Sequence, residues 1–220
     1  MLDLAWLTLV GVVAGALGGL LGIGGGVILM PVLRFGLGLP VELAAGTCVF
    51  GVFCTTVSGS LRHYRSRPLS LGRLVPVMGA GAATAIVASL AFHRLTGRET
   101  WLDLGVGAVI ALIAARMVWE GLRGARVDEQ PPDPSLPGSL GARLTIGGVA
   151  GALPGLLGIG TGGVLVPAFA LALRAPVKTA MAASLLCFTV TAGISLAFKL
   201  AQGYVVLGVA APLGLGALLG

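Results

Sequence analysis

Charged residues are scarce in this chain. Lys, Arg, Asp and Glu make up 10% of its 220 residues, whereas hydrophobic residues make up 56% and the mean hydropathy is +1.02. A water-soluble domain carries about 25% charged residues, so this composition excludes a domain that covers itself with polar surface. We therefore predict an integral membrane protein.

The scarcity of cysteine and of aromatic residues argues against further classes of protein. The three cysteines, Cys48, Cys54 and Cys187, lie inside apolar segments, so no disulfide framework is predicted. The net charge is +6, but aromatic residues make up only 5% and no basic patch is interleaved with them, which argues against nucleic-acid binding. We expect the basic residues in loops on the cytoplasmic side of a membrane instead.

Catalytic signatures are also missing. The sequence contains no HExxH or GxSxG motif and no His/Cys cluster with metal-ligand spacing. Residues 158–163 match G-x-G-x-x-G, but their flanks are apolar stretches of membrane length, and Lys178 stands near the position where a dinucleotide site needs an acid. We predict that the protein is not an enzyme and that it uses no cofactor and no metal.

The strongest positive feature is an internal duplication. Residues 15–33 (GALGGLLGIGGGVILMPVL) and 151–169 (GALPGLLGIGTGGVLVPAF) align without a gap at an offset of 136, with 12 of 19 positions identical. We predict a first transmembrane repeat over 1–122, a polar linker over 123–143 and a second transmembrane repeat over 144–220. Residue 220 corresponds to residue 84 of the first repeat, so we expect the second repeat to be truncated.

Seven apolar segments predict an all-α, polytopic transmembrane bundle. They cover 4–33, 44–61, 71–92, 101–119, 144–173, 180–197 and 205–219. As a straight helix, each 30-residue segment would be about 45 Å long, against a hydrocarbon core of about 30 Å. Because glycine clusters and Pro31 or Pro167 interrupt these segments, we predict broken helices at the glycine-rich motifs. One long tilted helix, packed closely through its glycines, remains the alternative.

The distribution of basic residues favours inverted repeats. If every segment crosses once, nine of the 14 Lys and Arg residues fall on one side; if segments 4–33 and 144–173 dip in and return, ten do. The second topology obeys the positive-inside rule slightly better and makes each repeat cross an odd number of times. Inverted repeats are typical of alternating-access transporters.

The duplicated motif resembles a known family. The stretches GLLGIGGGVILMPVL and GLLGIGTGGVLVPAF, with AAGTCVF (44–50) and AMAASLL (180–186), resemble the sulfite exporter TauE/SafE family of membrane permeases. The resemblance implies a secondary transporter of small anions, often sulfur oxyanions or organosulfonates, built from two related halves. The two copies differ where Thr161 replaces Gly25 and where Ala183-Ser184 replaces Thr47-Cys48.

The candidate substrate site lies at the two glycine-rich breaks. A broken helix leaves backbone N–H groups unpaired, and the start of a helix carries partial positive charge, so together they bind an anion without a buried cation. The alternatives are that the small residues only allow close helix packing and that the hydroxyls bond within their own helices. The predicted substrate-binding residues are Gly22, Gly24, Gly25, Gly26, Thr47, Gly158, Gly160, Thr161, Gly162, Gly163 and Ser184.

These features together predict a multi-pass permease of the cell inner membrane that moves small anions by alternating access. Its predicted partners are the small anionic substrate and the lipid bilayer, without nucleic acid, and association into a homo-oligomer is left open. A passive anion channel and a non-transporting membrane assembly protein remain as alternatives. The substrate's identity, the direction of transport and the coupling ion do not follow from the sequence.

Overall fold

The structure is a computed structural model that describes residues 4–66, 71–95, 99–122, 139–172 and 176–220. Within these ranges the chain forms helices and no strands, which confirms the all-α prediction. Five of the described helices are long and apolar enough to cross a membrane. They are α1 (Leu4–Leu21), α3 (Val41–Ser66), α4 (Leu71–Leu95), α6 (Leu140–Leu157) and α8 (Val177–Ala201). The others are α2 (Gly26–Pro31), the π-helical turn η1 (Val32–Gly36), α5 (Glu99–Leu122), α7 (Gly162–Ala172) and α9 (Leu207–Leu219).

The helices of the two halves begin at matching positions. The first residues of α1 and α6, of α2 and α7, of α3 and α8, and of α4 and α9 are each 136 positions apart. This spacing equals the offset of the duplicated sequence. The long helix α5 has no counterpart among the described elements.

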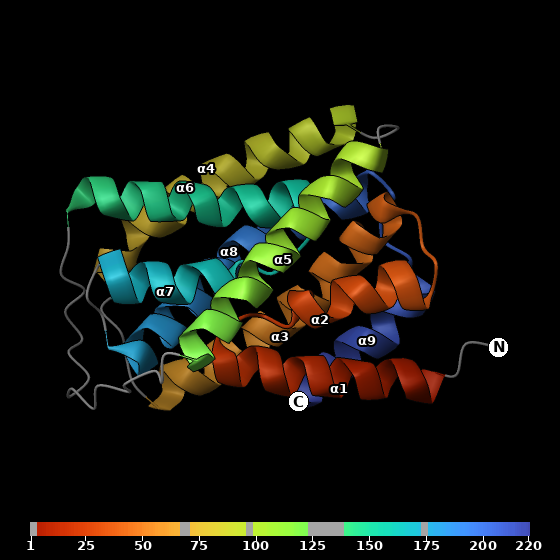
Figure 1. Ribbon diagram of the computed structural model, residues 1–220, viewed down its shortest axis with the longest axis horizontal. Coiled ribbons are helices and arrows are strands. Elements are labelled where there is room, and N and C mark those ends of the chain that lie inside the picture. The colour runs from red at the N-terminus through yellow and green to blue at the C-terminus, as the bar shows by residue number, and fades with distance from the viewer. Residues whose placement is uncertain (1–3, 67–70, 96–98, 123–138, 173–175) are drawn as a thin grey trace.

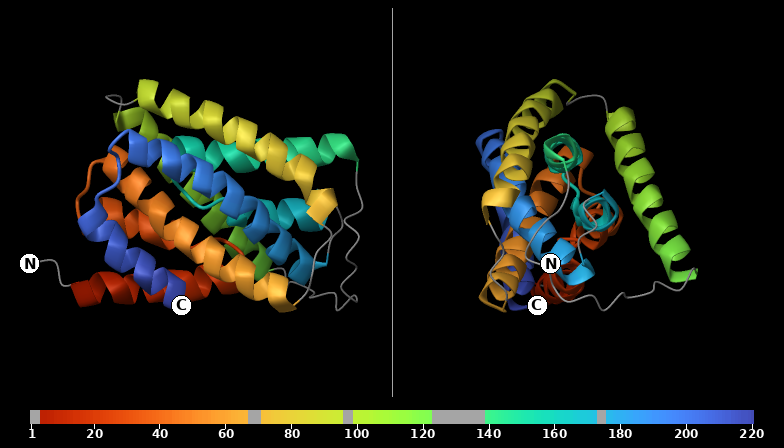
Figure 2. Two further views of the ribbon diagram at one scale, coloured as in Figure 1. Left: turned by 180° about the vertical axis from the view of Figure 1, so that it is seen from behind. Right: turned by 90° about the vertical axis from the view of Figure 1, so that its left-hand side faces the viewer.

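Matching helices run in opposite directions. In Figures 1 and 2, α1 and α6 point to opposite ends of the molecule, and so do α3 and α8. After α1, the chain turns and α2 with η1 runs back toward the end at which α1 begins. The chain of α7 returns in the same way toward the start of α6, so each glycine-rich segment begins and finishes at one end of the molecule.

Helices of the first half pack mainly on helices of the second half. Helix α1 packs mainly on α9, α4 packs mainly on α6, and α3 packs on α8 between them. Glycines allow these close approaches: a Cβ atom on Gly11 would meet the carbonyl group of Leu213, and one on Gly147 would meet that of Val77. Small residues that let backbones touch are a common device of helix pairs in membranes, and here the two contacts involve equivalent residues of the two halves.

The C-terminal end of the predicted linker, 123–143, is helical in the structure. Residues 123–138 lie outside the described residues, but the side chain of Ser139 accepts a hydrogen bond from the N–H of Ala142 at 3.2 Å and caps α6. A serine cap stabilises a helix start by about 1 kcal/mol. The last four residues of the predicted linker, 140–143, therefore belong to the helix.

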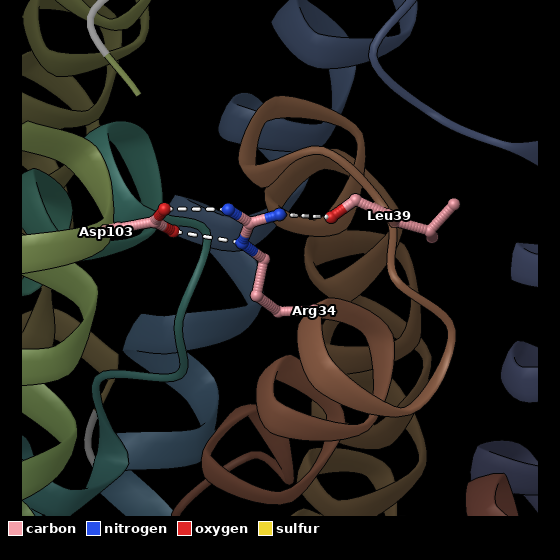
Figure 3. A network of polar contacts seen from close by, with 3 residues as sticks. All are labelled: Arg34, Leu39 and Asp103. Atoms are coloured by element: carbon pink, nitrogen blue, oxygen red, sulfur yellow. Dashed lines mark hydrogen bonds and ion pairs between the residues drawn. The ribbon is translucent and has the colours of Figure 1, made fainter. Parts of the chain in front are cut away.

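Helix α5 lies over the face that contains α2 and α7 (Figures 1 and 2). A bidentate ion pair ties it to η1, with 2.7 Å between Arg34 Nη2 and Asp103 Oδ2 and 3.0 Å between Arg34 Nε and Asp103 Oδ1 (Figure 3). The remaining arm of the guanidinium donates to the carbonyl oxygen of Leu39 at 3.0 Å. The equivalent of Arg34 in the second half is Ala170, so this tie holds only the first half.

Candidate functional site

The two glycine-rich turns face each other at the centre of the molecule. The chain leaves the helical conformation after Leu21 and resumes it at Gly26, and in the second half it does so between Leu157 and Gly162. A Cβ atom on Gly160 would lie 2.6 Å from the carbonyl oxygen of Ile23, and one on Gly26 would meet the backbone nitrogen of Gly160. The backbones of the two turns are therefore in direct contact, with no side chain between them.

Left-handed backbone conformations produce these turns. In the first turn Gly24 has a φ of 79°, and in the second Gly158 has a φ of 69°. The left-handed conformation costs a residue with a Cβ atom about 1–2 kcal/mol, so glycine is favoured at both positions. Gly158 lies against Ala45 of α3, and Gly22 lies against Met181 of α8, which is the equivalent contact of the other half.

Helix α8 covers the contact between the turns. A Cβ atom on Gly24 would lie 2.5 Å from the ring of Phe188, whose side chain is completely buried. The buried hydroxyl of Ser184 donates to the carbonyl oxygen of Gly22 at 3.3 Å. The structure thus brings the predicted residues Ser184, Gly22 and Gly24 together.

Unused hydrogen-bond donors gather at the start of α7. The hydroxyl of Thr161 is completely buried and has no hydrogen-bond partner among the described residues. The N–H groups of Gly160, Gly162 and Gly163 likewise donate to no acceptor in the described part of the chain. Because the start of a helix also carries partial positive charge, this group of donors is suited to a negatively charged ligand.

A cavity of about 180 Å³ lies between α6 and α7 and has Thr161 in its wall. Its lining is apolar apart from Thr145 and Thr161. Pockets for drug-sized ligands measure about 300–1,000 Å³, so this cavity suits a small solute. Apolar walls also lower the local dielectric constant, which strengthens the attraction between the donors and an anion.

Three predicted site residues take no part in the contact between the turns. The hydroxyl oxygen of Thr47 accepts a hydrogen bond from the N–H of Val206 at 3.1 Å, next to the start of α9. A Cβ atom on Gly163 would lie 2.8 Å from the side chain of Ile113 on α5, and one on Gly25, just before α2, would lie 2.7 Å from the carbonyl oxygen of Ala14 in α1. The contact between the turns is made by the other glycines of the two motifs.

One buried charge was not identified by the sequence analysis: Lys199, which stands two residues after the apolar segment 180–197. Its side chain is 0% exposed, and its ammonium nitrogen has no hydrogen-bond partner among the described residues. The nitrogen lies 3.4 Å from the centre of the Phe92 ring. The signal was helical spacing, because Ser184, Phe188, Thr191, Ser195 and Lys199 follow one another at intervals of three or four and so share one face of a helix.

Known proteins similar to this chain are described as membrane transporters. The profile of the sulfite exporter TauE/SafE family matches residues 7–220. A probable membrane transporter protein of Methanocaldococcus jannaschii is 29% identical over 189 residues, which cover 84% of this chain and 67% of that protein. A probable membrane transporter protein of Bacillus subtilis is 27% identical over 202 residues, or 81% of this chain and 71% of that protein. No solved structure is significantly similar to the chain.

Proposed function

Because the chain belongs to the sulfite exporter TauE/SafE family, a family of multi-pass membrane transporters, we propose that it carries small anions across the cell inner membrane. Sulfur oxyanions and organosulfonates are the proposed substrates. The observation that carries the proposal is the buried hydroxyl of Thr161, which has no partner among the residues that the structure describes and lies in the wall of a small cavity beside the start of α7.

The proposed binding chemistry needs no cation at the turns. The Thr161 hydroxyl and the N–H groups of Gly162 and Gly163 donate to the oxygens of the anion, in place of the water molecules that it loses. Hydrogen bonds to a charged group contribute about 1.5–3 kcal/mol each. The remaining glycines of the two motifs complete the site by letting one backbone approach the other.

The proposed architecture is a pair of inverted repeats, 1–122 and 144–220, each with a transmembrane helix broken at its glycine-rich motif. The matching helix starts and the opposite directions of α3 and α8 support it. Transporters of this kind expose a central site to the two sides in turn. The positive-inside rule then places the end of the molecule that holds the start of α6 in the cytoplasm.

The test compares Thr161→Val with the matched control Thr145→Val in proteoliposomes. Thr145 lines the same cavity, but its hydroxyl already donates to the carbonyl oxygen of Ala142 at 2.9 Å. Sulfite, sulfate, thiosulfate and isethionate are the probes. We expect Thr161→Val to raise the KM of the transported anion by about tenfold or more, while Thr145→Val stays near the wild type.

Two further results belong to the same test. Within the described part of the chain the Thr161 hydroxyl makes no hydrogen bond that valine would remove, so we expect Thr161→Val to be at least as stable to heat as the wild type and Thr161→Ser to keep transport. Saturable flux with counterflow identifies a carrier. A wild type that moves none of the probes, or a Thr161→Val variant with an unchanged KM, would contradict the proposal.

A further inference from the structure

The ammonium group of Lys199 lies outside the site at the two turns. It is completely buried, two residues before the end of α8, and it rests on the face of Phe92 from α4. The Tyr204 ring packs edge-on against Phe92, with 5.5 Å between the ring centres. A hydrogen bond of 3.0 Å between the Tyr204 hydroxyl and His93 Nδ1 fixes this aromatic layer.

The charge of Lys199 has no counter-charge in the described structure. No carboxylate of the described residues lies within ion-pair distance of its nitrogen. Asp103 is paired with Arg34, and Glu42 forms no ion pair with Lys199. A lysine at the centre of a membrane span costs about 2.5–3.5 kcal/mol by insertion scales. Lys199 is nearer the end of its helix, but it is buried, and its cation–π contact with Phe92 offsets only about 0.5–2 kcal/mol. Ionisable residues inside membrane spans are rare and mark substrate or ion pathways.

Buried polar residues of α8 lie between this charge and the contact between the turns, and the hydroxyls of Thr191 and Ser195 donate to the carbonyl oxygens of Phe188 and Pro154. Ser184, Thr191, Ser195 and Lys199 lie on one face of α8, and all are 0% exposed. From Ser184, which contacts Gly22, to Lys199 this face is about 22 Å long. On α4, one turn from Phe92, the hydroxyl of Ser89 is also completely buried and has no partner among the described residues.

The two ends of this arrangement lie on opposite sides of the centre. The cavity beside Thr161 extends along α6 to Thr145, near the beginning of that helix. Lys199 lies near the end of α8, and the beginning of α6 and the end of α8 are at opposite ends of the molecule (Figures 1 and 2). The position equivalent to Lys199 in the first half is His63, so both central helices carry a basic residue there.

We propose that Lys199 is a second anion-binding position on the transport path, on the side of the turns opposite to the Thr161 cavity. The inference rests on the proposed function and assigns it a cationic residue. In the conformation described here the ammonium is closed off beneath Phe92 and Tyr204. Small oxyanions are its ligands: when that aromatic layer moves aside, the anion replaces the face of Phe92 as the partner of the ammonium.

The first test compares Lys199→Met, Lys199→Arg and Lys178→Met in proteoliposomes, with sulfite and isethionate as probes. Methionine keeps the length of the side chain and removes the charge. Lys178 is an exposed lysine at the beginning of the same helix and is the matched control. We expect Lys199→Met to raise KM by about tenfold or more, as the loss of one charge-assisted contact implies. We expect Lys199→Arg to keep part of the affinity and Lys178→Met to behave as the wild type.

A chemical rescue separates charge from packing. In a background without Cys48, Cys54 and Cys187, Lys199→Cys is alkylated either with 2-bromoethylamine, which rebuilds a lysine-like ammonium, or with neutral iodoacetamide. Recovery of anion affinity with the first reagent alone supports the inference. Equal recovery with both, or a folded Lys199→Met protein with wild-type KM, overturns it. In either case Thr161-dependent transport by the wild type leaves the proposed function intact, whereas a wild type without anion flux removes both.

Discussion

Replacement of Gly160 by alanine tests the contact between the two turns most directly. The φ of Gly160 lies outside the left-handed region, so alanine adds only its methyl group. That methyl would lie 2.6 Å from the carbonyl oxygen of Ile23, which is backbone and cannot rotate away. Ordinary contact begins at 3.4 Å, so the turns must separate by about 0.8 Å, and overpacking of this kind costs about 1–3 kcal/mol.

The functional effect should exceed the effect on stability. A displacement of about 1 Å at a binding site can lower a rate by about 100-fold, so we expect anion flux through Gly160→Ala to fall by roughly that factor. Uptake into proteoliposomes measures the flux. Thermal unfolding, monitored by size-exclusion chromatography of heated samples, measures the stability. Gly19→Ala is the control, since a Cβ atom there meets nothing within 4 Å and Gly19 lies in α1 just before the first turn. If Gly160→Ala carried anions as fast as Gly19→Ala, a site built on touching backbones would be refuted.

Two further predictions concern the architecture. In a double-mutant cycle, Arg34→Ala and Asp103→Ala should show a coupling of about 1 kcal/mol in thermal stability, because the pair is bidentate but partly exposed; additive losses would mean that the pair does not hold α5 to η1. In a cysteine-free background, Leu4→Cys and Leu140→Cys should react with a membrane-impermeant thiol reagent from opposite sides, since these equivalent exposed residues begin α1 and α6. Labelling of both from one side would exclude inverted repeats.

The sequence predicted where the helices lie more successfully than it predicted which residues contact one another. The apolar segments 44–61 and 180–197 predicted α3 and α8, but both helices begin three residues earlier, directly after Pro40 and Pro176. Proline is tolerated at the start of a helix, because the first turn needs no N–H donor there. Ser139 was assigned to a linker because its surroundings are polar, yet serine is also a common helix cap. Local patterns thus indicated the elements, with errors of a few residues at their ends.

The long-range contacts could not be derived from local patterns. Nothing near Thr47 in the sequence indicates that its hydroxyl oxygen accepts a hydrogen bond from the N–H of Val206, 159 residues away. Lys199 follows the predicted apolar segment 180–197 by two residues, and a charge at such a position normally marks the end of an apolar segment. It is buried because the chain turns back after α8, where the N–H of Tyr204 donates to the carbonyl oxygen of Lys199 at 2.9 Å, and the Tyr204 ring then packs on Phe92.

In the proposed architecture of inverted repeats, helix α5 accounts for the opposite orientations of the two units. Its path carries the polypeptide from the end of the molecule where α4 finishes to the end where α6 starts (Figure 1). Without this additional traverse, the second unit would start on the same side as the first, and both would face the same way. A gene for one such unit alone could yield the same paired arrangement only if its product inserted in both orientations and then dimerised. In a fused chain, α5 makes that dual insertion unnecessary.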